Sequence, residues 1–185
     1  MPSPAASAQQ HFSARAGSEV TGAHWVGTTA VWTAAGIWAL LALHAAVTDI
    51  RHRVISRRSC WAAAALIAVL LAAAAFAEAQ ARHLLLVAAG AAGVLITGEV
   101  LYRAKPDAIG YGDIRLINAS SILTAWWGPQ WPWWALALGA VISVPQAVLA
   151  RVRHGSSATI AWAPALCAGT ALIIANRLAV DGPVP

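Results

Sequence analysis

Long apolar stretches separated by short polar segments dominate this chain. The first runs over residues 23–48 and carries no ionisable side chain apart from two histidines. Two more follow at about residues 59–77 and 84–102. Each is close to the roughly 20 residues that a helix needs to cross the hydrocarbon core of a membrane. The pattern predicts three membrane-spanning helices in the first part of the chain.

The uncharged stretch over residues 116–150 is too long for one span. The sequence Gly128-Pro129-Gln130-Trp131-Pro132 favours a turn, which divides the stretch into a short fourth helix and a fifth. A sixth is expected over about 157–176, kinked at Pro164. The fold prediction is therefore all-α, a polytopic membrane protein with six transmembrane helices and short loops. The expected organisation is a disordered tail over 1–22, a membrane domain over 23–178 and a C-terminal tail over 179–185.

Composition excludes several classes of protein. Hydrophobic residues make up 59% of the 185 residues and charged residues only 10%, which is far from the balance of a soluble globule. The net charge of +5 lies in scattered loops, so we expect no nucleic-acid partner. Cys60 and Cys167 form no CxxC pair and are expected to be packing residues. The sequence predicts neither a metal site nor a cofactor.

The basic residues orient the predicted helices. Nine of the twelve Lys and Arg residues lie in or beside the loops that follow the first, third and fifth spans. By the positive-inside bias these loops are cytoplasmic, and both termini lie outside. The nine are Arg51, Arg53, Arg57, Arg58, Arg103, Lys105, Arg115, Arg151 and Arg153. Five tryptophans then fall at one outer turn, where we expect an interfacial aromatic belt: Trp126, Trp127, Trp131, Trp133 and Trp134.

Two aspartates occupy matching borders of this arrangement. Asp49 ends the first span and Asp113 begins the fourth, so both are expected at the cytoplasmic edge of the membrane. Acidic residues at membrane depth are costly and tend to be functional. Two simpler interpretations remain open. Asp49 could be a surface carboxylate beside arginines, and Asp113 could be a helix N-cap.

If the two aspartates face each other, they cannot both ionise cheaply. One keeps a proton while the other acts as a base, which suits hydrolysis of a peptide bond. Gly110 and Gly112 would leave room for an extended substrate backbone, although an ordinary turn also explains them. Helix dipoles favour Asp113, at a helix start, as the base and Asp49, at a helix end, as the acid.

These residues resemble a known family. Asp49-Ile50-Arg51-His52-Arg53-Val54-Ile55 is similar to the first-aspartate motif of type IV prepilin peptidases, and Gly110-Tyr111-Gly112-Asp113-Ile114-Arg115-Leu116 to their GxGD motif. Ile160-Ala161-Trp162-Ala163-Pro164-Ala165-Leu166 resembles their last span more weakly. The resemblance covers about residues 30–177. Two positions depart from it: Ser56 stands where proline is usual, and Arg115 where lysine is common.

The resemblance implies an aspartic endopeptidase of the bacterial inner membrane. Asp49 and Asp113 would be catalytic, and the substrates would be the basic leader peptides of prepilins or pseudopilins. The chain looks like the short form found in Tad/Flp pilus systems, for which no methyltransferase activity is expected. An alternative from another class is a transport or pilus-assembly scaffold subunit that uses Asp49 and Asp113 to bind protons or cations.

Overall fold

The computed structural model describes the backbone of residues 4–105, 110–154 and 160–184, and the side chains of 22–105, 110–153 and 160–184. Within these residues all regular structure is helical and no strand occurs, as the sequence predicts. The elements are α1 (Pro4–His52), α2 (Arg57–Ala77), α3 (Ala81–Ala104), α4 (Tyr111–Thr124), a 3-10 helix η1 (Ala125–Trp127), α5 (Trp131–His154) and α6 (Ala163–Val180).

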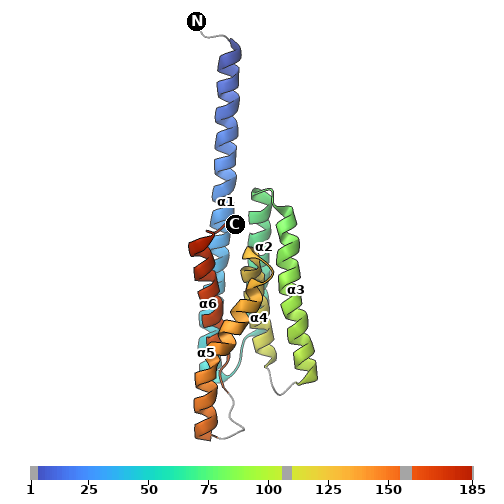
Figure 1. The fold of residues 1–185 in the computed structure, drawn as a ribbon, viewed down its shortest axis with the longest axis vertical. Helices are drawn as coiled ribbons and strands as arrows, with labels where there is room; N and C mark the ends of the chain where they lie inside the picture. Colours follow the sequence, from blue (N-terminus) through green and yellow to red (C-terminus); the bar gives the residue numbers. More distant parts are fainter. Residues whose placement is uncertain (1–3, 106–109, 155–159, 185) are drawn as a thin grey trace.

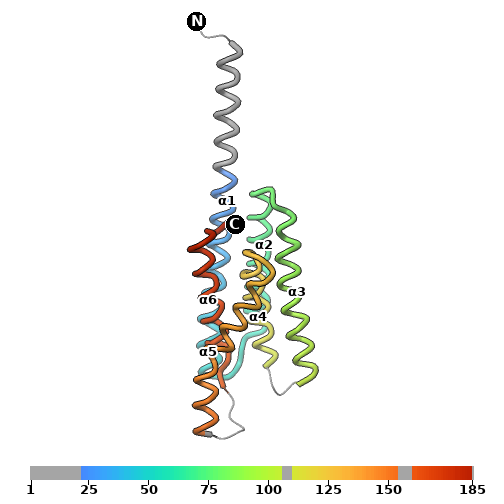
Figure 2. The backbone as a smooth tube through the Cα atoms, in the orientation of Figure 1, coloured from blue at the N-terminus to red at the C-terminus, as the bar shows by residue number. Residues whose placement is uncertain are grey.

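The helices run up and down through one bundle (Figure 1). Helices α1, α3 and α5 end at the end of the bundle where α2, α4 and α6 begin, which we call the basic end. The C-terminus and the α2–α3 turn lie at the opposite end, the tail end, as the backbone trace also shows (Figure 2). Exposed cations gather at the basic end: Arg51, Arg53, Arg57, Arg58, Arg103, Lys105, Arg151 and Arg153.

Helix α4 is the centre of the bundle. It contacts α1, α2, α3, α5 and α6, and both apolar and polar positions on it are buried. Leu116, Leu123 and Thr124 are fully buried, and Ser120 is nearly so. The indole N–H of Trp38 on α1 donates a hydrogen bond of 3.0 Å to Ser120 Oγ. Protein, not lipid, therefore surrounds this helix.

Among the described residues, five helices are long and apolar enough to cross a membrane, and α4 is not one of them. It has 14 residues, so it is roughly 21 Å long against about 30 Å of hydrocarbon. The protein is thus a polytopic helical membrane protein, but the predicted count of six spans is not confirmed. Because its neighbours shield α4, its polar side chains can hydrogen-bond within the protein, and it need not be as apolar as a helix that faces lipid.

The predicted domain boundaries stay predictions. Helix α1 is bounded at Pro4, so it overlaps the expected disordered tail over residues 1–22. The side chains of residues 1–21 lie outside the described part, and the candidate span of α1 begins at Gly22. At the other terminus α6 ends at Val180, inside the expected C-terminal tail over 179–185.

The sixth helix differs from its prediction. The sixth apolar helix expected over 157–176 is present, but its expected start and the expected kink at Pro164 are wrong, because α6 begins at Ala163 and Pro164 lies in its first turn. The first N–H groups of a helix have no partner within the helix, so proline costs little there. Pro164 therefore starts the helix instead of bending it. Residues 157–159 of the predicted span lie outside the described residues.

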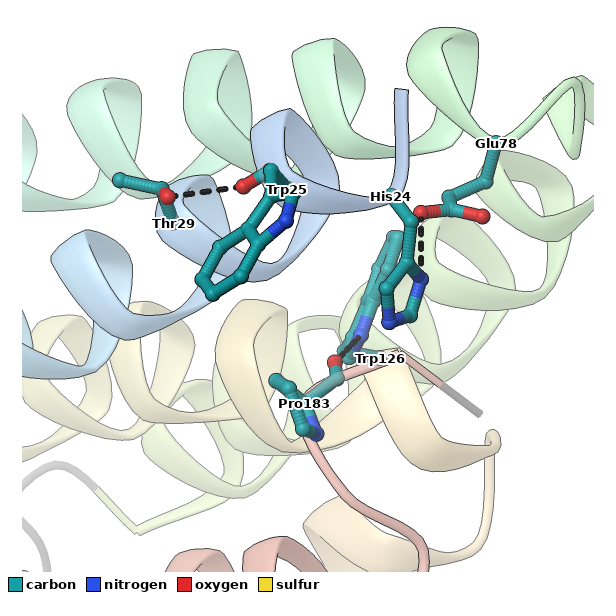
Figure 3. Close-up of polar contacts among 6 residues, drawn as sticks. All are labelled: His24, Trp25, Thr29, Glu78, Trp126 and Pro183. Atoms are coloured by element: carbon teal, nitrogen blue, oxygen red, sulfur yellow. Dashed lines mark hydrogen bonds and ion pairs between the residues drawn. The ribbon is translucent and has the colours of Figure 1, made fainter. Parts of the chain in front are cut away.

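The expected aromatic belt is only partly correct. Trp133 and Trp134 are exposed, but Trp126 is completely buried and Trp127 nearly so. The indole N–H groups of Trp126 and Trp127 donate to the carbonyl oxygens of Pro183 and Gly182, at 2.8 and 3.0 Å. Figure 3 shows the Trp126–Pro183 bond beside an ion pair of 3.3 Å between His24 and Glu78. These two tryptophans fasten the C-terminal segment to the bundle, a role that sequence position alone does not reveal.

Helices α5 and α6 touch through their backbones. A Cβ added at Gly169 would lie 2.4 Å from the backbone nitrogen of Gly139 and 2.7 Å from the carbonyl oxygen of Ala135. Neither atom can move without displacing its helix. Small residues permit such close crossings between membrane helices. Gly169 therefore sets the separation of the two helices.

We expect Gly169→Ala to lower the free energy of unfolding by about 1–3 kcal/mol, the usual cost of overpacking a close contact. Thermal unfolding of the purified protein in detergent measures it. Gly36→Ala is the matched control, because no atom lies within 4 Å of a Cβ placed there. Equal stability of the two variants would contradict the proposed constraint.

Candidate active site

Asp49 extends the buried face of α1 by one position. The buried residues of this helix recur every three or four positions, and Asp49, at 8% exposure, continues that spacing. The preceding members are Val31, Ala34, Trp38, Leu41 and Ala45. Its Oδ2 accepts a hydrogen bond of 3.1 Å from the backbone N–H of Ala163, the first residue of α6. Asp49 thus faces the interior, and it is not the surface carboxylate of the simpler interpretation.

The loop after Asp49 has a defined geometry. Arg53 adopts a left-handed backbone conformation, φ 55°, and its N–H bonds to the carbonyl oxygen of Asp49 at 3.1 Å, which ends α1. Ser56 is the N-cap of α2 with φ −65°. That is the angle to which a proline ring is fixed, so serine keeps the backbone angle that proline would impose. Its Oγ also accepts the N–H of Ser59 at 3.4 Å, which proline could not do.

Asp113 lies in the first turn of α4. The N-cap of this helix is Gly110, not Asp113 as the simpler interpretation had it, and Asp113 is the third residue of the helix. The backbone of Gly110 favours the charged form of its carboxyl group, and Oδ2 of Asp113 would lie 3.0 Å from a Cβ added at Gly110. The helix start therefore fixes the direction of this side chain toward the N-cap.

The charge of Asp49 acts on the carboxyl group of Asp113. Asp113 lies outside the five candidate spans, and its pKa is raised from 3.8 to about 6. Burial is the largest cause and the charge of Asp49 the second, while the hydrogen bond from Gly110 acts in the opposite direction. Like charges raise each other's pKa only when they lie close together. Asp49 and Asp113, from two distant parts of the sequence, are therefore neighbours.

The raised pKa of Asp113 is opposite in direction to the effect expected from the dipole of α4. That expectation made Asp113 the ionised member of the pair, yet desolvation and the charge of Asp49 outweigh the start of α4. Asp49 lies at the end of α1 and also meets the start of a second helix. The first N–H of α6 at Ala163 bonds to Asp49 and stabilises its negative charge.

Gly110 and Gly112 face different surroundings. A Cβ on Gly110 would lie 3.0 Å from Oδ2 of Asp113, so a side chain would crowd the carboxylate itself. A Cβ on Gly112 would lie 3.0 Å from Cβ of Ile55, in the loop after Asp49. Contact of either glycine with substrate stays a prediction. The structure adds a second reason for glycine at each position. A side chain at position 110 would crowd the carboxylate of Asp113, and one at position 112 would crowd the loop after Asp49.

Sequence reasoning did not single out two residues of this site, Ala163 and Ile55. Ala163 acts through its backbone N–H, and its only signal was the weak resemblance of the Pro164 segment to a last span. Ile55 was known only as the end of the first motif. The two cysteines, Cys60 and Cys167, are free and buried, as expected of packing residues.

The fold and site define a polytopic helical membrane protein with a paired-carboxylate site at one end of its bundle. The model of the type IV leader peptidase family matches residues 35–150, which is more than half of the chain and includes both aspartates. This protein belongs to that family, and a peptidase activity follows from the membership. Neither the curated proteins nor the solved structures contained a match.

We expect Asp49→Asn to lower the pKa of Asp113 from about 6, because the substitution removes the charge that is the second cause of its elevation. Burial remains, so the pKa should stay above 3.8. Infrared titration of the carboxyl band in purified protein measures the shift. Glu99→Gln is the control, since Glu99 pairs with Arg103 at 2.9 Å and does not act on Asp113. An unchanged pKa of Asp113 in Asp49→Asn would contradict the electrostatic interaction between the two aspartates.

Proposed function

We propose that this protein is an aspartic endopeptidase that removes the basic leader peptide from prepilin-like or pseudopilin-like substrates. Family membership supports leader peptidase activity in general. The observation that carries the aspartic mechanism is the coupling of the two carboxylates, one in each motif, with one of them titrating near pH 6. A pair that shares one proton is what metal-independent hydrolysis of a peptide bond requires.

In this mechanism Asp49 is the base and Asp113 the acid of the resting enzyme. Asp49 takes a proton from water as the water oxygen attacks the scissile carbonyl carbon, and Asp113 gives its proton to the carbonyl oxygen. The tetrahedral diol then collapses. Asp49 returns its proton to the leaving nitrogen, and Asp113 takes one from a diol hydroxyl. Both carboxyl groups end in their starting states. The Ala163 N–H favours the charge on Asp49 with which the cycle begins.

The exposed cations support the proposed orientation. Eight of them surround the end of the bundle that holds the two aspartates. The positive-inside bias places such an end on the cytoplasmic side, in the bacterial inner membrane, with both termini outside. Cleavage would then occur at the inner membrane surface, where a short basic leader meets a hydrophobic helix. The lack of methyltransferase activity stays a prediction, consistent with two cysteines and no CxxC pair.

We expect Asp49→Asn and Asp113→Asn each to abolish processing of a co-reconstituted prepilin-like substrate, because each deletes one of the two titrating groups. The measurement is the fraction of substrate cleaved in liposomes, read by mass spectrometry. Glu99→Gln removes a carboxylate from the same end of the bundle and should leave cleavage unchanged. Cleavage that persists in either aspartate variant contradicts the mechanism. Absence of cleavage in the wild type, with proton or cation flux that needs both aspartates, would favour the transport alternative.

The pH dependence follows from the same assignment. Asp113 must hold its proton to act as the acid, so kcat/KM should fall as pH rises through about 6, the pKa of that carboxyl in the free enzyme. Because the carboxylates interact, the falling limb reports the pair. The check is a profile of kcat/KM from pH 4.5 to 8 in detergent. A falling limb that lies no lower than pH 8 would show that the proton on Asp113 is not required.

A further inference from the structure

The two motif segments touch through one side chain. Ile55 ends the first motif and lies against Gly112, which directly precedes Asp113. A Cβ on residue 112 would meet Cβ, Cγ1 and Cδ1 of Ile55 at 3.0, 3.4 and 3.5 Å. The first of these distances is shorter than an ordinary carbon–carbon contact. Even one methyl group at position 112 would therefore push the two segments apart.

Ile55 has little freedom to retreat. It is partly buried and packs against the main hydrophobic core. Before Ile55 in the chain, Arg53 has a left-handed backbone conformation that ends α1. After it, Ser56 caps α2. A displacement at this contact would therefore pass along the short loop to Asp49, and along the first turn of α4 to Asp113.

We propose that Ile55 is a positioning residue of the peptidase, whose packing on Gly112 sets the separation of the two catalytic carboxylates. The proposal rests on the proposed function and adds a role that neither motif assigns. It also gives Gly112 a purpose other than room for a substrate backbone. Glycine is required there because Ile55 occupies the place of a side chain.

A size-compensation experiment separates the two explanations of Gly112. We expect Gly112→Ala to lower kcat by on the order of 10- to 100-fold with little change in KM, since small misplacements of reacting groups have such effects. Ile55→Ala in the same chain removes the Cγ1 and Cδ1 contacts and should restore part of the activity. Ile55→Gly also removes the Cβ contact and should restore more. If the substrate needs the space over Gly112, shortening Ile55 restores nothing.

The opposite side of α4 offers a matched control. Gly98 on α3 faces Ile114 in the same way, with Cγ2 of Ile114 at 3.3 Å from an added Cβ. Gly98→Ala crowds α4 without touching the loop that follows Asp49, so its kcat should change much less. Ile114→Ala removes the same side-chain volume as Ile55→Ala, but from α4, and should not restore activity to Gly112→Ala.

A spectroscopic readout distinguishes positioning from a loss of folding. In Gly112→Ala the greater distance to Asp49 should shift the titration of Asp113 to lower pH, and Ile55→Gly should return it. If Gly112→Ala yields no folded protein, Ile55→Ala alone serves, with a lower kcat, a nearly constant KM and a shift of the Asp113 titration in the opposite direction, to higher pH, because the shorter side chain lets the two segments approach. Full activity of Gly112→Ala, a loss that neither Ile55 change rescues, or an unshifted titration overturns the proposal. The proposed function fails separately, if the wild type does not cleave or an aspartate variant does.

Discussion

Two electrostatically interacting carboxylates at the end of an apolar bundle, Asp49 buried and Asp113 partly buried, are the constraint on which this structure depends. An unpaired charge in such a place is costly, so each carboxylate needs a fixed donor. Asp49 obtains one from Ala163, the first residue of α6, and the backbone of Gly110, the N-cap of α4, favours the charged form of Asp113. Those donors remain on the backbone whatever side chains surround them. The remaining electrostatic cost appears as the proton that Asp113 retains up to about pH 6.

Helix α4 can carry Asp113 because five longer helices shield it. A short helix with Asn118, Ser120, Ser121 and Thr124 on it would be unstable against lipid. Inside the bundle its hydroxyl groups bond to α4 carbonyls and to the Trp38 indole. At its far end, η1 places Trp126 and Trp127 against the C-terminal segment. The central helix is thus fixed at the tail end, and its first turn stays in register with the loop after Asp49.

The family's sequence pattern has a physical explanation in this arrangement. The first motif supplies a carboxylate, a left-handed turn at Arg53 and a side chain, Ile55, that reaches α4. The second supplies the start of α4, the carboxylate of Asp113 and two glycines. A side chain at Gly110 would crowd Asp113, and one at Gly112 would crowd Ile55. Ser56 keeps the φ angle of the proline that it replaces and adds a cap. Serine at this position therefore requires no change in the φ angle that a proline would impose.

The sequence by itself determined the long apolar helices, the end of the bundle at which the cations gather and the two aspartates at that end. These features follow from local hydrophobicity, helix length and charge, which neighbouring residues encode. The tertiary structure decided that α4 is central, that Trp126 is buried and that α6 begins at Ala163. It also raised the pKa of Asp113, through burial and the charge of Asp49. These effects, the N–H bound to Asp49 and the contact of Ile55 with Gly112 all arise between residues far apart in the chain.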